Sequence, residues 1–303
     1  MLTYPKKPTR RFRAEADTTT PGTLERQFAD LDMGRVAYLR YGPADGKAPP
    51  LLLVHGIPTS CRLWEPLLGA LGEQFDCIVP DLLGLGESTP SAGADLSSPG
   101  QADMLAALLD ELGIDTCRAV FHDQGGAHGG QMLKRHGERI DAVVLTDVVC
   151  FDNWPVPIID GLMAMGRAIK PLAAARIPQV LMRLFPWPQT TFRRRIPEVF
   201  LRDWHAALNE GGERLDHWIA YTTAQTNHWT QDAVATLKAW DKPAHVIWAA
   251  EDRFLLASWA VELAQAIPGA DNNPEMLPFA GHFWQTEVPQ TGAAAILRFF
   301  DRA

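Results

Sequence analysis

The sequence predicts an α/β fold in which a mostly parallel central sheet is flanked by helices. Short apolar runs of strand length alternate with longer segments of helical periodicity, and one long stretch without strand-like runs interrupts this alternation. The 303 residues are 47% hydrophobic and 21% charged, which is typical of a globular chain that buries a large core. This composition excludes a disordered or collagen-like protein.

The first 24 residues are interpreted as a flexible arm. They are basic and polar and lack the apolar middle region of a secretory signal, so we expect a cytoplasmic protein. No apolar run approaches the roughly 20 residues of a membrane-spanning helix. The formal net charge of −8 disfavours a nucleic-acid partner. The four cysteines lack CxxC spacing, and neither a metal ion nor another cofactor is expected.

The elements after this arm are expected to begin with a hairpin and to continue as strands alternating with helices. Two alternating segments, Gln27–Leu31 and 35–41, flank a turn signal and predict an antiparallel hairpin. Further strands are predicted at 51–54, 76–79, 118–121, 142–145 and 244–248. Helices are predicted at 63–71, 101–112, 126–136, 259–267 and 292–302. Strands that alternate with helices in this way form a parallel sheet covered on both faces.

Residues 148–229 break the alternation. They contain amphipathic segments at 158–170 and 199–209, several prolines and five tryptophans, but no strand-like run. Because a structureless loop of this length is uncommon in a compact domain, we expect a helical cap inserted after the sixth strand. The core is then predicted to comprise residues 25–147 and 230–303.

Loops that follow the predicted strands carry the candidate functional residues, because ligands of open parallel sheets bind beyond the carboxyl ends of the strands. Residues 121–126, Phe-His-Asp-Gln-Gly-Gly, have the pattern of a nucleophile elbow with Asp123 at its centre. The serine form, G-x-S-x-G, occurs nowhere in the chain, which disfavours a serine esterase. Taken alone, Asp123 is better explained as the N-cap of the helix that follows it.

The order of polar residues in the other loops favours a nucleophile. Asp252 follows Asp123 by 129 residues, and His282 follows Asp252 by 30 residues. In that order, Asp252 orients the imidazole of His282, which takes a proton from water. The backbone N–H groups of Ile57 and Gln124 are expected to form an oxyanion hole.

These motifs together resemble the α/β-hydrolase fold with a cap, over the span from residue 31 to residue 302. The His-Asp-x-Gly-Gly elbow is similar to that of the epoxide hydrolase and haloalkane dehalogenase branch, whose nucleophile is an aspartate. Residues 81–88 resemble the family segment D-x-x-G-x-G-x-S, and His282-Phe283 resembles its G-H-F segment. The resemblance implies that Asp123 forms an alkyl ester, which water activated by His282 hydrolyses.

The triad acid and the leaving-group donor are the points that the resemblance leaves open. Some dehalogenases place the acid where Asp147 stands, so Asp147 remains an alternative to Asp252. Haloalkane dehalogenases share a tryptophan just after the nucleophile, where this chain has Gln124. Fluoroacetate-type dehalogenases share arginines around the elbow, and this chain has none at those positions. Tyr221, 98 residues beyond Asp123, matches the second cap tyrosine of epoxide hydrolases and is the donor candidate.

The resemblance therefore favours an epoxide hydrolase for small to medium hydrophobic epoxides. A haloalkane or haloacid dehalogenase is the alternative, and a non-hydrolytic lyase or a ligand sensor is the alternative from a different class. The pocket candidates are His55, His122, Trp154, Trp229 and Phe283. His128, one turn after Gln124, is interpreted as a packed histidine. We expect the protein to act on a small hydrophobic substrate and water, and to be a monomer or a homodimer. Neither a nucleic acid nor a membrane is expected as a partner.

Overall fold

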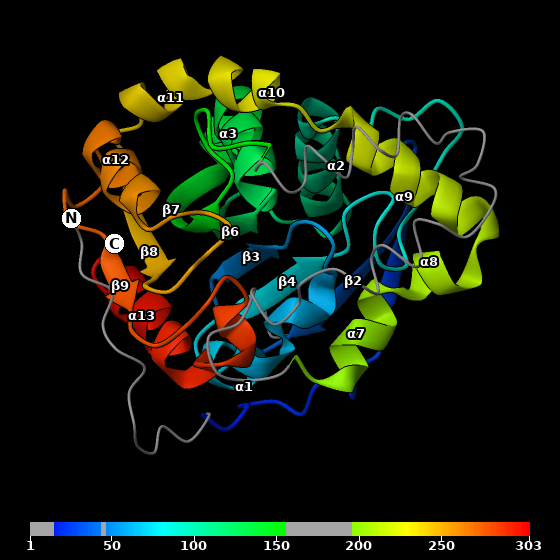
Figure 1. Cartoon of the computed structure of the whole chain (residues 1–303), viewed down its shortest axis with the longest axis horizontal. Coiled ribbons are helices and arrows are strands. Elements are labelled where there is room, and N and C mark those ends of the chain that lie inside the picture. Colours follow the sequence, from blue (N-terminus) through cyan, green and yellow to red (C-terminus); the bar gives the residue numbers. More distant parts are fainter. Residues whose placement is uncertain (1–14, 44–46, 156–195) are drawn as a thin grey trace.

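A computed structural model describes residues 15–43, 47–155 and 196–303 of the chain. Its centre is a nine-stranded sheet of order β1-β2-β4-β3-β6-β7-β8-β9, with β5 paired to β2 (Figure 1). The strands are β1 Gln27–Leu31, β2 Gly34–Tyr41, β3 Pro50–Val54, β4 Asp76–Pro80, β5 Thr89–Pro90, β6 Cys117–Asp123, β7 Ile140–Val148, β8 Ala244–Ala249 and β9 Glu275–Leu277. Strand β2 pairs antiparallel with β1, β4 and β5. The remaining pairs, along β4-β3-β6-β7-β8-β9, are all parallel, which confirms the predicted mostly parallel sheet.

Helices cover both faces of this sheet, with α1 and α13 on one face and α2, α3 and α12 on the other (Figure 1). The helices are α1 Glu65–Leu71, α2 Ser98–Glu111, α3 Gly125–His136, α7 Glu198–Trp204, α8 Ala206–Glu210, α9 Gly212–Ala224, α10 Asn227–Asp232, α11 Val234–Ala239, α12 Ser258–Ala266 and α13 Pro289–Phe300. Strand β3 shows why two cores form. Leu52 and Val54 face the α2–α3 side, whereas Leu51 and Leu53 face the α1–α13 side, since successive side chains of a strand point to opposite faces.

The predicted order of elements is confirmed, and the differences have local causes. Strands β5 and β9 were not predicted, because two and three residues are too few to produce a pattern. Counting β5, the inserted helices follow the seventh strand rather than the sixth. The single helix expected at 199–209 is two helices that meet at His205. The helical segment expected at 158–170 lies outside the described residues.

The expectation of a flexible arm as far as residue 24 is wrong for residues 15–24. The N–H of Thr18 donates to the carbonyl oxygen of Pro66 over 2.8 Å, and the N–H of Gly22 donates to the carboxylate of Glu65. Glu15 accepts a hydrogen bond from the backbone N–H of Thr291 at 2.9 Å. Backbone and carboxylate partners on α1 and α13 therefore hold this segment in place. Residues 1–14 lie outside the described residues.

The predicted end of the cap at residue 229 falls inside α10. This helix packs on the core helix α3, where the side-chain amide of Gln131 donates to the carbonyl oxygen of Trp229 over 2.9 Å. Helices α7 to α9 lie together on the right-hand side of Figure 1, whereas α10 lies at the top beside α3. The last three residues of the predicted cap, 227–229, thus lie in a helix that contacts the core helix α3.

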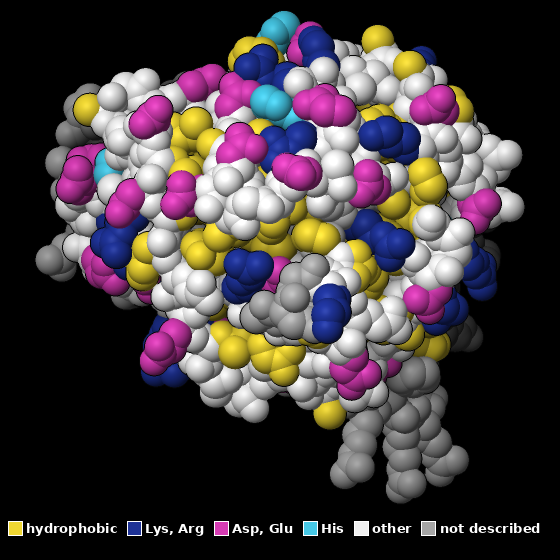
Figure 2. Space-filling view, turned by 180° about the vertical axis from the view of Figure 1, so that it is seen from behind, with side chains coloured by type: hydrophobic (Ala, Val, Ile, Leu, Met, Phe, Trp, Pro, Cys, Tyr) yellow, Lys and Arg dark blue, Asp and Glu magenta, His cyan; other side chains and the backbone are white. Residues whose placement is uncertain are grey.

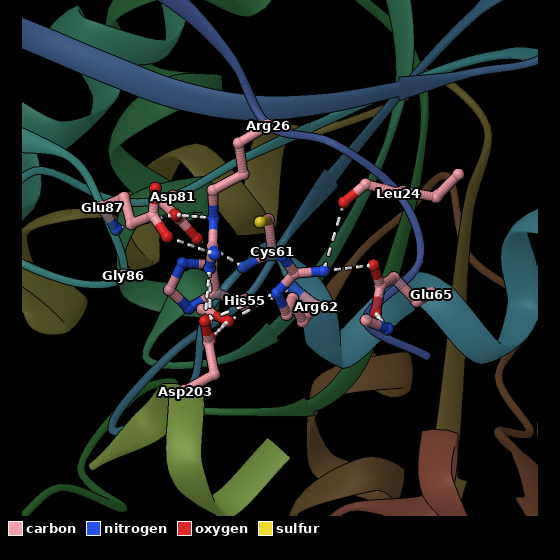
Figure 3. Close-up of polar contacts among 12 residues, drawn as sticks. Leu24, Arg26, His55, Cys61, Arg62, Glu65, Asp81, Gly86, Glu87 and Asp203 are labelled. Carbon is pink, nitrogen blue, oxygen red and sulfur yellow. Dashed lines mark hydrogen bonds and ion pairs between the residues drawn. The ribbon is translucent and has the colours of Figure 1, made fainter. Parts of the chain in front are cut away.

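A buried arginine joins three distant parts of the chain (Figure 3). The side chain of Arg26 is 4% exposed and forms ion pairs of 2.9 Å with Asp81 after β4, with Glu87 and with Asp203 on α7. Burial alone would raise the pKa of Asp81, but the charge of Arg26 and hydrogen bonds from the backbone N–H groups of Cys61 and Glu87 lower it. The loop after β4 and the helix α7 are therefore both held to the segment that precedes β1.

The surface carries no large region of a single charge on the face shown in Figure 2, where acidic and basic side chains are interspersed. Within residues 15–43, 47–155 and 196–303, no helix is both long enough and apolar enough to cross a bilayer.

Candidate active site

Asp123 lies on a sharp turn between β6 and α3. Its φ of 53° is in the left-handed region that few residues other than glycine adopt, as expected for the central residue of a nucleophile elbow. The glycines that follow it leave room for the turn: a Cβ on Gly126 would lie 2.3 Å from the Cβ of Val148. The elbow that the sequence predicted at residues 121–126 is therefore present in the structure.

The carboxylate of Asp123 lies against the loop after β3. Its Oδ1 accepts a hydrogen bond of 2.6 Å from the backbone N–H of Ile57. A Cβ on Gly56 would lie 2.2 Å from that oxygen and 2.4 Å from the backbone nitrogen of Gln124. The absence of a side chain at Gly56 thus allows the loop that holds Ile57 to lie close to both the carboxylate of Asp123 and the backbone nitrogen of Gln124.

His282 lies between two carboxylates. Its Nε2 is 3.3 Å from Oδ2 of Asp123, and its Nδ1 is 2.8 Å from Oδ2 of Asp252. The other oxygen of Asp252 accepts hydrogen bonds from the N–H groups of Phe254 (2.7 Å) and Leu255 (3.0 Å). The structure therefore brings together the three residues that the chain order selected, with both carboxylates held by backbone donors.

The charges around His282 set its protonation. Burial by itself would lower the pKa of His282, but the carboxylates of Asp252 and Asp123 raise it well above its ordinary value. The ring is thus stabilised as an imidazolium while both carboxylates are ionised. Loss of the charge on Asp123 would remove part of that stabilisation.

Asp147 belongs to the same cluster but does not contact the imidazole as Asp252 does. It lies within β7 with a φ of 46° and accepts hydrogen bonds from the N–H of Ala249 (3.0 Å) and the hydroxyl of Thr146 (2.9 Å). Burial and the charge of Asp252 raise the pKa of Asp147 well above its ordinary value, and its carboxyl is hydrogen-bonded to Asp252. Of the two acids left open by the sequence, Asp252 is the one at His282 Nδ1.

The group formed by Asp147, Asp252 and His282 also has the composition of a cation site. Its possible ligand atoms lie within 4.8 Å of one another. Hydrogen bonds among these residues and to backbone donors already engage those atoms. The arrangement is therefore best described as a hydrogen-bonded relay that ends at His282.

Tyr221 is fully buried on α9, although it comes from the inserted helices. Its hydroxyl lies 2.8 Å from Nε2 of His128 on α3. Burial, with a smaller contribution from the charge of Asp123, raises the pKa of Tyr221 well above its ordinary value. The hydroxyl is therefore a neutral hydrogen-bonding group within the electrostatic reach of Asp123.

Two histidines predicted to line the pocket hold loops instead. Nε2 of His55 accepts a hydrogen bond of 3.1 Å from the N–H of Leu82, so its Nδ1 carries the proton and donates to Gly56 over 2.9 Å. His122 donates from Nε2 to the carbonyl oxygen of His282 over 3.0 Å. Burial and the nearby His282 lower the pKa of His122 to about 3. Both rings position the residues around Asp123.

The aromatic pocket candidates lie in different places. Phe283 packs against His282 with ring centroids 4.9 Å apart and against Trp204 of α7 at 5.1 Å, which links the triad loop to the inserted helices. Trp154 is buried in the core. The half-buried ring of Trp229 packs on exposed His228. Trp229 thus lies on α10, where its carbonyl oxygen accepts a hydrogen bond from Gln131 of α3.

Sequence reasoning missed two features, one in the residue next to Asp123 and one under the inserted helices. The side-chain amide of Gln124 is fully buried, and neither its oxygen nor its nitrogen has a hydrogen-bond partner among the described residues. A cavity of about 340 Å³ lies between the loop after β4 and helices α7 to α9, next to Gly84, which packs on Tyr221. Both depend on contacts between distant segments, so a single sequence carries no local signal for them.

Comparison with known proteins gives consistent results. A family model described as alpha/beta hydrolase fold matches residues 49–287. Haloalkane dehalogenase 2 of Mycobacterium tuberculosis is 27% identical over 286 residues, which cover 91% of this chain and 95% of the relative. A cis-3-alkyl-4-alkyloxetan-2-one decarboxylase of Shewanella oneidensis is 31% identical over 148 residues, which cover 47% of this chain and 45% of the relative.

Two further matches agree with these. A soluble epoxide hydrolase of Corynebacterium is 32% identical over 119 residues, which cover 37% of this chain and 41% of the relative. Among solved structures, a haloalkane dehalogenase from Bradyrhizobium elkani aligns with a TM-score of 0.73 at 22% identity, over 93% of this chain and 99% of that one. At 22% identity, this structural similarity supports the assignment of the fold only.

Proposed function

The chain belongs to the alpha/beta hydrolase fold family, and on this premise we propose that it hydrolyses small to medium hydrophobic epoxides through an ester on Asp123. The observation that carries the proposal is the position of His282, 3.3 Å from Asp123 on one side and 2.8 Å from Asp252 on the other. A carboxylate suits attack on saturated carbon, and the histidine then suits hydrolysis of the ester so formed.

The first half-reaction forms the ester. A carboxylate oxygen of Asp123 attacks one epoxide carbon in line with the ring oxygen, and the carbon–oxygen bond on the far side breaks. The Tyr221 hydroxyl gives its proton to the departing oxygen, which becomes the first hydroxyl of the product. The inserted helices, predicted as a cap over residues 148–229, would bring this donor to the site.

The second half-reaction releases the product. Because the ester no longer carries the charge of Asp123, the pKa of His282 falls and the imidazolium releases its proton to solvent. The neutral imidazole then accepts a proton from the attacking water. The resulting hydroxide attacks the carbonyl carbon of the ester, and the N–H groups of Ile57 and Gln124 stabilise the oxyanion. Collapse restores the Asp123 carboxylate. The two protons of the water protonate the second product oxygen and restore the hydroxyl of Tyr221. His282, which again faces a charged Asp123, takes back a proton from solvent.

An oxygen leaving group fits the chain better than a halide. The hydroxyl of Tyr221 and the buried amide of Gln124 can both donate a hydrogen bond to a departing oxygen. Haloalkane dehalogenases share a tryptophan at the position of Gln124, and this chain lacks it. Dehalogenation is the second candidate, because the haloalkane dehalogenase relative aligns over 91% of the chain. The oxetanone decarboxylase match keeps a lyase acting on a strained oxygen ring as the candidate from a different class.

Mass spectrometry of a His282→Gln variant tests this proposal. The variant is incubated with styrene oxide, cyclohexene oxide and bromocyclohexane, and the peptide that holds Asp123 is then weighed. We expect an adduct equal to the whole epoxide, and none in a matched Asp123→Asn, His282→Gln double variant. An adduct of the alkyl group without halogen would select the dehalogenase. A folded variant that no compound labels would contradict the covalent mechanism.

A further inference from the structure

His128 and Tyr221 form a buried pair that the proposed reaction, as described so far, uses only in part. Nε2 of His128 and the hydroxyl oxygen of Tyr221 are 2.8 Å apart, and the two rings meet edge to face with centroids 5.9 Å apart. Both side chains are fully buried. No local sequence pattern connects the two positions, which are 93 residues apart.

The pair lies close to the nucleophile. His128 is in the first turn of α3, which begins at Gly125, two residues after Asp123. The charge of Asp123 acts on Tyr221. Two contacts hold the tyrosine in place. Its Cβ packs against Gly84. One helical turn later, the side-chain amide of Gln225 donates a hydrogen bond of 2.8 Å to the carbonyl oxygen of Leu96.

The direction of the hydrogen bond follows from the second ring nitrogen of His128. Burial, with a smaller contribution from His55, lowers the pKa of His128 to about 3, so the ring is neutral and carries one proton. Its Nδ1 is buried without a hydrogen-bond partner among the described residues. A proton on Nδ1 would be a buried donor without an acceptor, whereas a proton on Nε2 leaves only a lone pair unpaired, the better tolerated arrangement.

We propose that His128 donates its Nε2 proton to the hydroxyl oxygen of Tyr221 and thereby leaves the Tyr221 proton free for the leaving group. His128 is then a positioning residue that acts through Tyr221. This inference rests on the proposed function, because it specifies how the leaving-group donor is held. In the first half-reaction the Tyr221 proton passes to the departing oxygen, and the hydrogen bond from His128 stabilises the phenolate until water restores the proton.

The location of the proton can be measured without a substrate. Nitrogen NMR of protein labelled in its histidine rings, with His128 assigned from a His128→Gln variant, distinguishes the two neutral tautomers. We expect His128 to carry its proton on Nε2, and the Nε2 resonance to shift in Tyr221→Phe. A proton on Nδ1 would overturn the proposal, because the tyrosine would then be the donor within the pair.

The effect on reaction is measured as the rate at which styrene oxide labels Asp123 in the His282→Gln background. Loss of a general acid costs 10²- to 10⁴-fold in general, and we expect His128→Leu to slow labelling by about 100-fold. His128→Gln, which retains an N–H donor, should restore much of the rate. Because both changes act through one hydroxyl, His128→Leu should slow labelling no further once Tyr221→Phe is present.

Controls separate this inference from a loss of fold and from a failure of the proposed function. Exposed His228 on α10 is the matched histidine, and His228→Leu should leave labelling unchanged. Equal slowing by His128→Leu with and without the Tyr221 hydroxyl would indicate a purely structural role and overturn the proposal. If no variant is labelled at all, the covalent mechanism fails, whereas the NMR tautomer still decides the direction of the hydrogen bond.

Discussion

Asp147 and Asp252 are hydrogen-bonded to each other beneath the imidazole of His282, although one lies within β7 and the other follows β8. Burial and the charge of Asp252 raise the pKa of Asp147. Burial would also raise the pKa of Asp252, but the charge of His282 and the hydrogen bonds from His282, Asp147 and Leu255 together lower it. The pair therefore carries one negative charge at neutral pH, and that charge lies on Asp252, next to the ring.

The two acids should respond differently to the same substitution. Asp147→Asn replaces a neutral carboxyl by a neutral amide that can still donate to Asp252, so kcat should change little. Asp252→Asn removes the charge and the acceptor at Nδ1 of His282, and loss of a triad carboxylate in a related arrangement lowers kcat by about 10⁴-fold. Steady-state kinetics of the two variants test this, and the reverse order would assign the triad acid to Asp147.

Asp147 should also make stability depend on pH. The pKa of Asp147 is higher in the folded protein than in the unfolded chain. At a pH above the unfolded-state pKa, the folded protein therefore keeps a proton that the unfolded chain has released. The free energy of unfolding consequently falls as the pH rises. Asp147→Asn removes this effect. The melting temperature of the variant relative to that of the natural chain should therefore rise steadily with pH, and a difference that stays constant would show that Asp147 is ionised in the folded protein.

His282 should lose basicity when Asp123 loses its charge. Asp123→Asn imitates the neutral ester in size and charge, and it removes one of the two carboxylates that raise the pKa of His282. A proton NMR titration of the histidine rings should show a lower pKa for His282 in this variant than in the natural chain. An unchanged pKa would mean that Asp252 alone sets the protonation of the ring.

Gly56→Ala should abolish activity through a steric effect on the carboxylate. The new Cβ would lie 2.2 Å from Oδ1 of Asp123 and 2.4 Å from the nitrogen of Gln124, closer than real Cβ contacts. Gly137→Ala is the matched control, since its nearest neighbour is the end of the Trp240 ring at 3.3 Å. Activity and melting temperature of both variants check this, and an active Gly56→Ala would contradict the tight approach of the loop.

Arg26→Leu should destabilise the protein strongly. It would leave Asp81 buried without its cation, and breaking a buried ion pair on one side costs about 3–5 kcal/mol. Arg35 is the control, because its pair with Asp30 is exposed and such pairs contribute about 0–1 kcal/mol. Urea unfolding of Arg26→Leu and Arg35→Leu measures the contrast, and equal losses would show that the buried cluster adds no stability.

The alternation of apolar runs and helical segments was enough to predict the sheet, because each core strand is buried on both faces. Strand β9 could not be predicted from three residues, since its pairing with β8 depends on a neighbour already in place. The segment 15–24 was misjudged for a similar reason. Its polar composition indicated a loose arm, whereas its backbone donors find acceptors on α1 that are distant in sequence.

The candidate site was predictable where a local pattern defined it. Asp123 stands in a recognisable turn, and the order of Asp252 and His282 along the chain placed them at neighbouring strand ends. The choice between Asp147 and Asp252 required the positions of two strand ends relative to one ring. The contact of Tyr221 with His128 depends on how α9 lies on α3, and hydrophobic periodicity carries no information about that docking.

The ion pairs of Arg26 set a condition on exchanging parts between this protein and others of its family. Asp203 on α7 is 177 residues from Arg26, and its carboxylate also accepts a hydrogen bond from the hydroxyl of Ser60. A chimaera that receives foreign helices in place of α7 to α9 would retain Arg26 and Ser60 but lose their shared acceptor. Such a graft should dock correctly only when the donor segment brings a carboxylate to the position of Asp203.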